Sequence, residues 1–265
     1  MAVTSARRCR YAESRPDVVL RPYVHSFWTF DVVQAPHERF EHHVWPDGCV
    51  SVLIASRPGA PAIALVSGAH AGPLTVPIVG CVSYRGVRFR PEAGAAVLGV
   101  ETTSVSGRSQ PLLTVCRDDE TLARRVGEPD THREGLRRLR AWVRRRVEDV
   151  PLDVLVGRAV ETLTETHGQA PIASLAAALG IGVRQLERRF QRTVGVSPKQ
   201  FARIRRMRSL IAAVLDHRAS WVSRAADHGY ADQAHCTREL SRLTGLSPRV
   251  LESRVRAIEH HGVRP

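Results

Sequence analysis

The sequence predicts an α+β protein: an N-terminal antiparallel β-barrel with helices, and a C-terminal all-α domain of two helix-turn-helix units joined by a long helix. Two observations support this fold class. Val- and Ile-rich runs within residues 16–115 are broken about every 8–12 residues by Gly, Pro and Asp, the spacing of a folded antiparallel sheet. Residues 171–251 contain one helical module written twice. A chain of 265 residues is long enough for two domains, which we expect at 1–150 and 151–265.

The expected strands lie in six apolar runs, at residues 25–33, 42–55, 62–68, 74–80, 84–91 and 95–100. Pro46, Asp47 and Gly48 form a turn inside the second run, because Pro presets φ and Gly supplies the positive φ that follows. Short strands at this spacing are typical of a sandwich or a small barrel.

Six side chains of this region combine the aromatic walls and polar anchors of a small-molecule pocket, namely Trp28, Trp45, Asp47, Tyr84, Arg88 and Arg90. The alternative for each is an aromatic core residue or a solvated arginine. Arg88 and Arg90 share a face if residues 84–90 form a strand, and this pair favours an anionic ligand.

A metal site in the barrel would need several histidines and a carboxylate on neighbouring strands. His42, His43 and His70 are the candidates, but adjacent residues of a strand point to opposite faces, so His42 and His43 cannot both face the interior without a bulge. We therefore expect no metal ion, and no motif indicates a cofactor.

Residues 121–150 predict a very basic helix with an apolar stripe at Leu136, Leu139, Val143 and Val147. Its Arg-rich surface is either an accessory DNA contact or dimerisation surface, or the solvated face of a helix packed on the barrel, and we favour the packed helix. Residues 149–151 then mark a linker, and the next helix is expected at 152–166.

The repeated module begins with a short helix and a tight turn. In each copy an Ala lies four residues before a Gly, and Gly-x-Ser-Pro closes the unit, which places the two units at about 173–195 and 221–245. A small residue in the first helix lets the second helix cross closely, and Gly tolerates positive φ at the turn. Ser197 and Ser247 each precede a Pro, the N-cap and N1 pattern that opens another helix.

The second helix of each unit has one apolar stripe, formed by Leu186, Phe190 and Val194 in the first copy and by Cys236, Leu240 and Leu243 in the second. The opposite face of each helix is polar. Between the units, residues 198–215 predict a long helix with an apolar face at Phe201, Ile204, Met207, Ile211 and Val214. Four arginines on its other faces contact either phosphates or solvent.

These two units resemble the DNA-binding region of the AraC/XylS family of transcription regulators, over residues 164–251. The resemblance implies two recognition helices that enter successive major-groove segments on one face of DNA. Cys236, Leu240 and Leu251 depart from the aromatic residues common in the family. The segments RPYVHSFWTF, VWPDGCVSVLI and GVRFRPEAGAAVLGV resemble the cupin-like sensory domain of one branch of that family, which implies a small-molecule effector or a homodimer.

Residues near the start of a recognition helix contact base edges, and Arg can bond guanine with two hydrogen bonds. The candidates for DNA binding are Arg184, Gln185, Glu187, Arg188, Gln191, Gln233, Thr237, Arg238 and Ser241. Each arginine is alternatively a phosphate contact, which positions the protein without specifying sequence. Asp232 is expected to be an N-cap rather than a base contact.

The formal charge of +13 favours a polyanionic partner, although only Lys199 is a lysine and a GC-rich genome produces the same excess of Arg. The five cysteines are scattered, the first residues do not form a signal peptide, and no run is long enough to span a membrane, so we expect a cytoplasmic protein.

The sequence therefore predicts a sequence-specific transcription regulator, not an enzyme, since no Gly-x-Ser-x-Gly or comparable nucleophile motif is present. The family resemblance implies an effector-responsive activator that binds promoter DNA and RNA polymerase. The alternative is a sequence-tolerant or effector-independent architectural DNA-binding protein.

Overall fold

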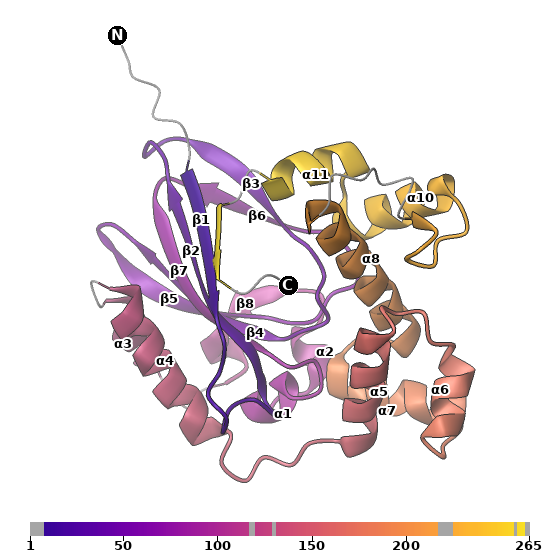
Figure 1. Cartoon of the computed structure of the whole chain (residues 1–265). Helices are drawn as coiled ribbons and strands as arrows, with labels where there is room; N and C mark the ends of the chain where they lie inside the picture. The colour runs from indigo at the N-terminus through magenta and orange to yellow at the C-terminus, as the bar shows by residue number, and fades with distance from the viewer. Residues whose placement is uncertain (1–7, 117–119, 129–130, 217–224, 257–258, 263–265) are drawn as a thin grey trace.

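The computed structural model describes residues 8–116, 120–128, 131–216, 225–256 and 259–262. An antiparallel sheet forms most of the N-terminal region, and helices form the C-terminal region (Figure 1). The predicted α+β fold class is thereby confirmed.

The larger sheet has seven strands in the order β8-β5-β4-β7-β2-β1-β9. They are β1 (Arg8–Ser14), β2 (Val24–Val33), β4 (Ser51–Arg57), β5 (Ala60–Ser67), β7 (Val82–Phe89), β8 (Ser109–Pro111) and β9 (Glu259–Gly262). The strands β3 (Arg39–Val44) and β6 (Leu74–Val79) form a separate two-stranded ribbon. The expected barrel is therefore open: β8 and β9 are edges that no described strand joins, and the ribbon pairs with neither.

Alternation along the strands divides the N-terminal region into layers. On one face of the large sheet, Phe27, Ile54 and Val87 pack against α3 (Leu122–Gly127) and α4 (His132–Arg146). On the other face, Phe30 and Tyr84 pack against residues of the β3–β6 ribbon. Two short helices, α1 (Gly94–Leu98) and α2 (Thr102–Val105), and the 3-10 turn η1 (Leu112–Thr114) complete this region.

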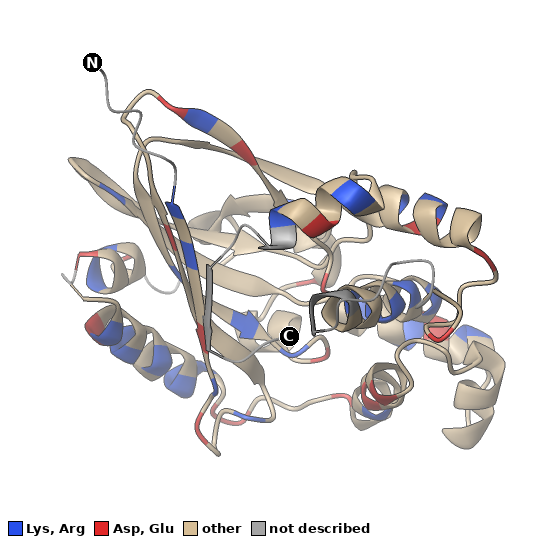
Figure 2. Cartoon of the chain, turned by 45° about the horizontal axis from the view of Figure 1, so that its top comes forward, with Lys and Arg blue, Asp and Glu red and all other residues tan. Residues whose placement is uncertain are grey.

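The basic segment 121–150 forms two helices, and α4 packs on the sheet through Leu139, Trp142 and Val143. Figure 2 shows many basic residues along this helix. Several of them bond neighbouring groups, such as Arg144 with Asp17. The packing of this helix on the sheet is confirmed, and Trp142 extends the predicted stripe.

Six helices of the C-terminal region are described: α5 (Val154–Glu165), α6 (Ile172–Ala178), α7 (Val183–Val194), α8 (Pro198–Asp216), α10 (Gln233–Thr244) and α11 (Pro248–Arg256). The first unit consists of α6 and α7, with a turn at Gly180 (φ +70°). Residues 217–224, which include the expected start of the second unit at about 221, lie outside the described residues. Ser197 forms a capping box with Gln200 at the start of α8, as the Ser-Pro pattern predicts.

Helix α8 belongs to two cores. Phe201 packs with Leu186 and Phe190 of the first unit, whereas Ile204 and Met207 pack in the second core. The second core also contains the three predicted residues Cys236, Leu240 and Leu243. A salt bridge of 2.8 Å between Arg203 Nε and Glu239 Oε2 joins α8 to α10. The long helix α8 therefore packs against both helix-turn-helix units.

The sheet region packs directly on α8 and α7. The backbone at Gly48 has φ +75°, and a Cβ built there would lie 2.6 Å from two ring atoms of Phe201. Thr102 of α2 donates one hydroxyl toward the carbonyls of Gln191 and Arg192 near the end of α7. The Pro-Asp-Gly turn predicted from the sequence thus forms part of the contact with the first helix-turn-helix unit.

We expect Gly48→Ala to lower the free energy of unfolding by about 2–4 kcal/mol. The left-handed backbone is unfavourable for any residue with a Cβ, and the added Cβ would also clash with Phe201. Gly59→Ala is the matched control, since Gly59 has φ +71° with open space around it. That control should cost about 1–2 kcal/mol. Urea unfolding measures both, and equal losses would show that the Phe201 contact contributes nothing.

Candidate DNA-binding face and ligand cavity

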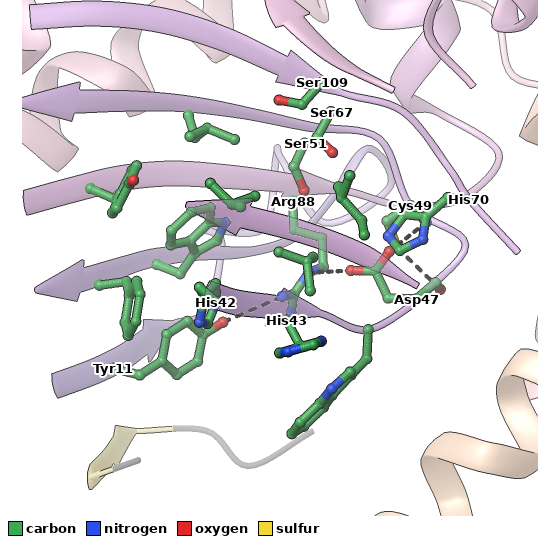
Figure 3. Close-up of a pocket in the computed structure, with 18 of the residues that line it drawn as sticks. Tyr11, His42, His43, Asp47, Cys49, Ser51, Ser67, His70, Arg88 and Ser109 are labelled. Carbon is green, nitrogen blue, oxygen red and sulfur yellow. Dashed lines mark hydrogen bonds and ion pairs between the residues drawn. The ribbon is translucent and has the colours of Figure 1, made fainter. Parts of the chain in front are cut away.

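A cavity of about 540 Å³ lies between the large sheet, the β3–β6 ribbon and α8. Even-numbered residues of β2 and β7 and odd-numbered residues of β4 and β5 face it, as strand alternation requires. The structure brings together five of the six predicted pocket residues on its wall: Trp28, Trp45, Asp47, Tyr84 and Arg88. Figure 3 shows the polar groups of the cavity.

Arg88 is the centre of a buried ion cluster. Its Nη1 lies 2.8 Å from Glu13 Oε1, and its Nε lies 2.9 Å from Asp47 Oδ2. Tyr11 bonds Glu13, and its hydroxyl lies 3.4 Å from Arg88 Nη2. The backbone N–H of Cys49 donates to Asp47 Oδ1 at 2.8 Å. The guanidinium of Arg88 thus contacts two carboxylates and a phenol from two segments of the chain, β1 and the turn after β3.

These contacts set the protonation states of the cluster. Burial by itself raises the pKa of Asp47, but Arg88, Arg208 and the N–H of Cys49 outweigh it and hold that pKa below its usual value. Burial raises the pKa of the Tyr11 hydroxyl and of the Cys49 thiol. Near neutral pH, Asp47 is therefore a carboxylate, and Tyr11 and Cys49 are uncharged.

Arg90 was expected beside Arg88, and the structure corrects this prediction. Strand β7 ends at Phe89, so the alternation that would give the two arginines one face stops before residue 90. The side chain of Arg90 bonds Glu92 Oε1 at 2.6 Å, and the residue is not part of the cavity wall. The anionic ligand predicted from this pair loses one of its two anchors.

His42 and His43 are adjacent on β3, and both contribute to the cavity wall. Strand β3 pairs only with β6, and isolated two-stranded ribbons twist more strongly than wide sheets. Burial lowers the pKa of His42 to about 4, and its ring lies 4.8 Å from that of Phe30. Within the described parts of the chain, no group of three or more His, Cys, Asp or Glu is placed to hold a metal ion.

Two parts of the cavity wall were not predicted. Tyr11 and Glu13 lie on β1, and Met207, Arg208 and Ile211 lie on α8. The alternating segment RCRYAES contained a signal for β1, since Cys9, Tyr11 and Glu13 recur at a period of two. The inward stripe of α8 was predicted, but the sequence could not show that its far end faces the sheet.

The first candidate DNA-binding surface is the outer face of α7. Leu186, Phe190 and Val194 are fully buried, whereas the side chains on the opposite face are exposed: Arg184, Gln185, Glu187, Arg188 and Gln191. Arg189 bonds Asp153, the N-cap of α5, at 2.9 and 3.0 Å. This bond fixes α7 to α5 from the inner side and leaves the outer face open.

The second candidate surface is the outer face of α10. Gln233 and Arg238 are exposed, and Thr237 and Ser241 are partly exposed. Asp232 accepts a hydrogen bond of 2.6 Å from the backbone N–H of His235, so it is the N-cap, as the sequence predicts. Both sets of predicted residues therefore lie on outward helical faces.

The chain matches two known domain families. Residues 175–254 match a helix-turn-helix domain, and residues 12–110 match a domain of unknown function (DUF6597). No curated protein matches the chain.

Solved structures with similarity to the chain include ToxT from Vibrio cholerae, with 8% identity and a TM-score of 0.42 over 95% of this chain and 98% of that one. ToxT with a bound unsaturated fatty acid gives 8% identity and a TM-score of 0.39 over 95% and 97%. The C-terminal domain of AraT, a response regulator from Geobacillus stearothermophilus, gives 19% and 0.36 over 38% and 86%.

The helices α7 and α10 both pack on α8, expose polar faces and lie within the matched helix-turn-helix domain. This arrangement defines a DNA-binding protein. The helix-turn-helix domain is of the AraC type and follows the DUF6597 domain, and the chain is a DNA-binding transcription regulator. Among the described helices, none combines the length and apolar character needed to cross a membrane.

The low pKa of His42 predicts a loss of stability in acid. In the unfolded chain His42 takes up a proton near pH 6.5, whereas in the folded chain its pKa is about 4. The free energy of unfolding therefore falls as the pH falls through that window. His42→Gln should reduce this slope by about 1 kcal/mol per pH unit between about pH 6 and pH 4.5. Denaturant unfolding at several pH values measures it.

The control for this measurement is His37→Gln, at an exposed position between β2 and β3. It should keep the slope of the unsubstituted protein. An unchanged slope in His42→Gln would mean that His42 is hydrated in the folded chain.

Proposed function

We propose that the protein is an effector-responsive, sequence-specific regulator in which a small molecule in the cavity controls how the two recognition helices meet DNA. The observation that carries this proposal is that α8 both joins the two units and forms part of the cavity wall. A ligand against Met207 and Ile211 therefore touches the element that positions both α7 and α10.

A second route connects the cavity to the first unit. Asp47 belongs to the ion cluster, and the next residue, Gly48, lies against the ring of Phe201. Phe201 in turn packs on Phe190 of α7, with ring centroids 5.4 Å apart. A ligand that moves Asp47 thus moves a backbone segment in contact with the first core. This chain of contacts gives the effector a physical means to change the DNA-binding state.

On DNA, α7 and α10 enter neighbouring major-groove segments about one helical turn, roughly 10 bp, apart. Arg184 and Arg188 are the base contacts of α7, and Gln233, Thr237 and Arg238 hold the corresponding positions on α10. The AraC/XylS resemblance supports action in the cytoplasm on promoter DNA, with activation through RNA polymerase. We place the division between the sensing and DNA-binding domains in the segment between α4 and α5.

Arg188→Ala tests the proposed base contact. If Arg188 bonds a base, the variant should lose about 1–3 kcal/mol of discrimination between the preferred site and random DNA. Fluorescence anisotropy on both duplexes at one salt concentration measures this difference. Equal weakening on both duplexes would make Arg188 a phosphate contact.

Arg145→Ala is the matched control, because Arg145 is an exposed arginine on α4, across the sheet from the C-terminal helices (Figure 1). It removes the same charge and should leave both affinities unchanged. A loss of affinity in this variant would instead support the accessory DNA contact considered for this helix.

A further inference from the structure

The cavity wall carries balanced charge. Among the described residues that line it, the carboxylates are Glu13 and Asp47, and the guanidinium groups are Arg88 and Arg208. Two negative groups therefore meet two positive ones. Adding an ionic ligand would leave one charge in excess inside a largely apolar enclosure, which is costly unless water or a counterion follows it.

Arg88 already faces both of these carboxylates. Its Nη1 and Nε each face a carboxylate at 2.8 and 2.9 Å, and its Nη2 faces Tyr11. A ligand carboxylate at Arg88 would compete with Glu13 and Asp47 for one guanidinium, and displacing either would leave a largely buried carboxylate without its partner. The charge of Arg208, from α8, also acts on Asp47, whose pKa it helps to lower. Both carboxylates thus already have a cationic partner within the protein.

Beside Arg88, a row of hydroxyl groups crosses the sheet. Ser51 of β4 lies opposite Arg88 of β7, Ser67 of β5 lies opposite Ser51, and Ser109 of β8 lies opposite Ser67. All three serines line the cavity, and Figure 3 shows them one behind another. No side-chain hydrogen bond of these serines occurs within the described residues. Hydroxyls can both donate and accept, so the row can bond a hydroxyl or a carbonyl oxygen.

Most of the remaining wall is apolar, with Phe30, Leu53 and Leu65 from the sheet, Val76 and Ile78 from the ribbon and Ile211 from α8. The imidazoles of His42, His43 and His70 also line the cavity. A volume of about 540 Å³ lies within the usual range for cavities that enclose small organic molecules. The cavity therefore offers a large apolar surface and one polar edge, whose carboxylates and guanidinium groups are equal in number.

We propose that the ligand of this cavity is an uncharged, mostly apolar small molecule whose hydroxyl or carbonyl oxygen bonds the row of Ser51, Ser67 and Ser109. This inference rests on the proposed role of the cavity as the effector site. It replaces the anionic ligand that Arg88 and Arg90 suggested in the sequence.

Matched probes that differ only in charge test the proposal. We would titrate the full chain by isothermal calorimetry, near neutral pH, with 2-naphthylmethanol, 2-naphthoate and 2-naphthylmethylammonium, and then with decan-1-ol, decanoate and decylammonium. Each alcohol should bind at least about tenfold more tightly than the two ions with the same hydrocarbon skeleton. An ion that binds as tightly as its alcohol would overturn the inference and leave the cavity as an effector site. If no probe of either set binds, the proposed effector site itself fails.

Two variants locate the effect in the cavity. Glu13→Gln removes one of the balancing carboxylates, so binding of 2-naphthoate should improve about tenfold relative to 2-naphthylmethanol. Glu161→Gln, at an exposed carboxylate on α5, is the control and should leave this ratio unchanged. Ser67→Ala should weaken the alcohol about three- to tenfold, with the same melting temperature as the unsubstituted chain. Unchanged ratios in Glu13→Gln and unchanged alcohol binding in Ser67→Ala would place the probes elsewhere and contradict the proposal.

Discussion

The burial of α8 is the packing constraint on which the rest of the structure depends. Phe201, near its start, fills the core of the first helix-turn-helix unit, and Met207, further along, fills the core of the second. The same helix closes one side of the cavity with Met207 and Ile211. Because protein interiors are close-packed, a shift of this helix cannot be absorbed in one core alone. The contact between Gly48 and Phe201 adds the sheet to the same packed unit.

The cavity exists because the two faces of the large sheet are covered differently. Helices α3 and α4 cover one face closely, through side chains such as Leu139 and Trp142. The other face is covered by a two-stranded ribbon and by α8, which leave space between them. The ion cluster at Arg88 occupies one side of that space and joins β1, β7 and the turn after β3. Breaking a buried pair of this kind leaves an unpaired charge, so the cluster also holds these segments in one arrangement.

The C-terminal helices were predictable because their information is local: Ser-Pro caps, turn glycines and stripes at helical spacing such as Leu186, Phe190 and Val194 mark each element within a few residues. The open sheet was not predictable, because the pairing of strands depends on contacts between distant segments. Arg90 shows the limit of a periodic argument, since alternation holds only while the strand continues and β7 ends one residue earlier. Glu13 and Met207 meet at the cavity although they lie far apart in the sequence, and no local pattern shows such a meeting.

The selection of bound sequences from random duplex DNA by the full-length protein tests the central claim most directly. If α8 holds α7 and α10 at one fixed separation, the enriched site should contain two sequence blocks whose centres lie about 10 bp apart. A single enriched block would mean that only one unit contacts bases. Salt-sensitive binding without any enriched sequence would contradict the claim and favour a sequence-tolerant architectural protein.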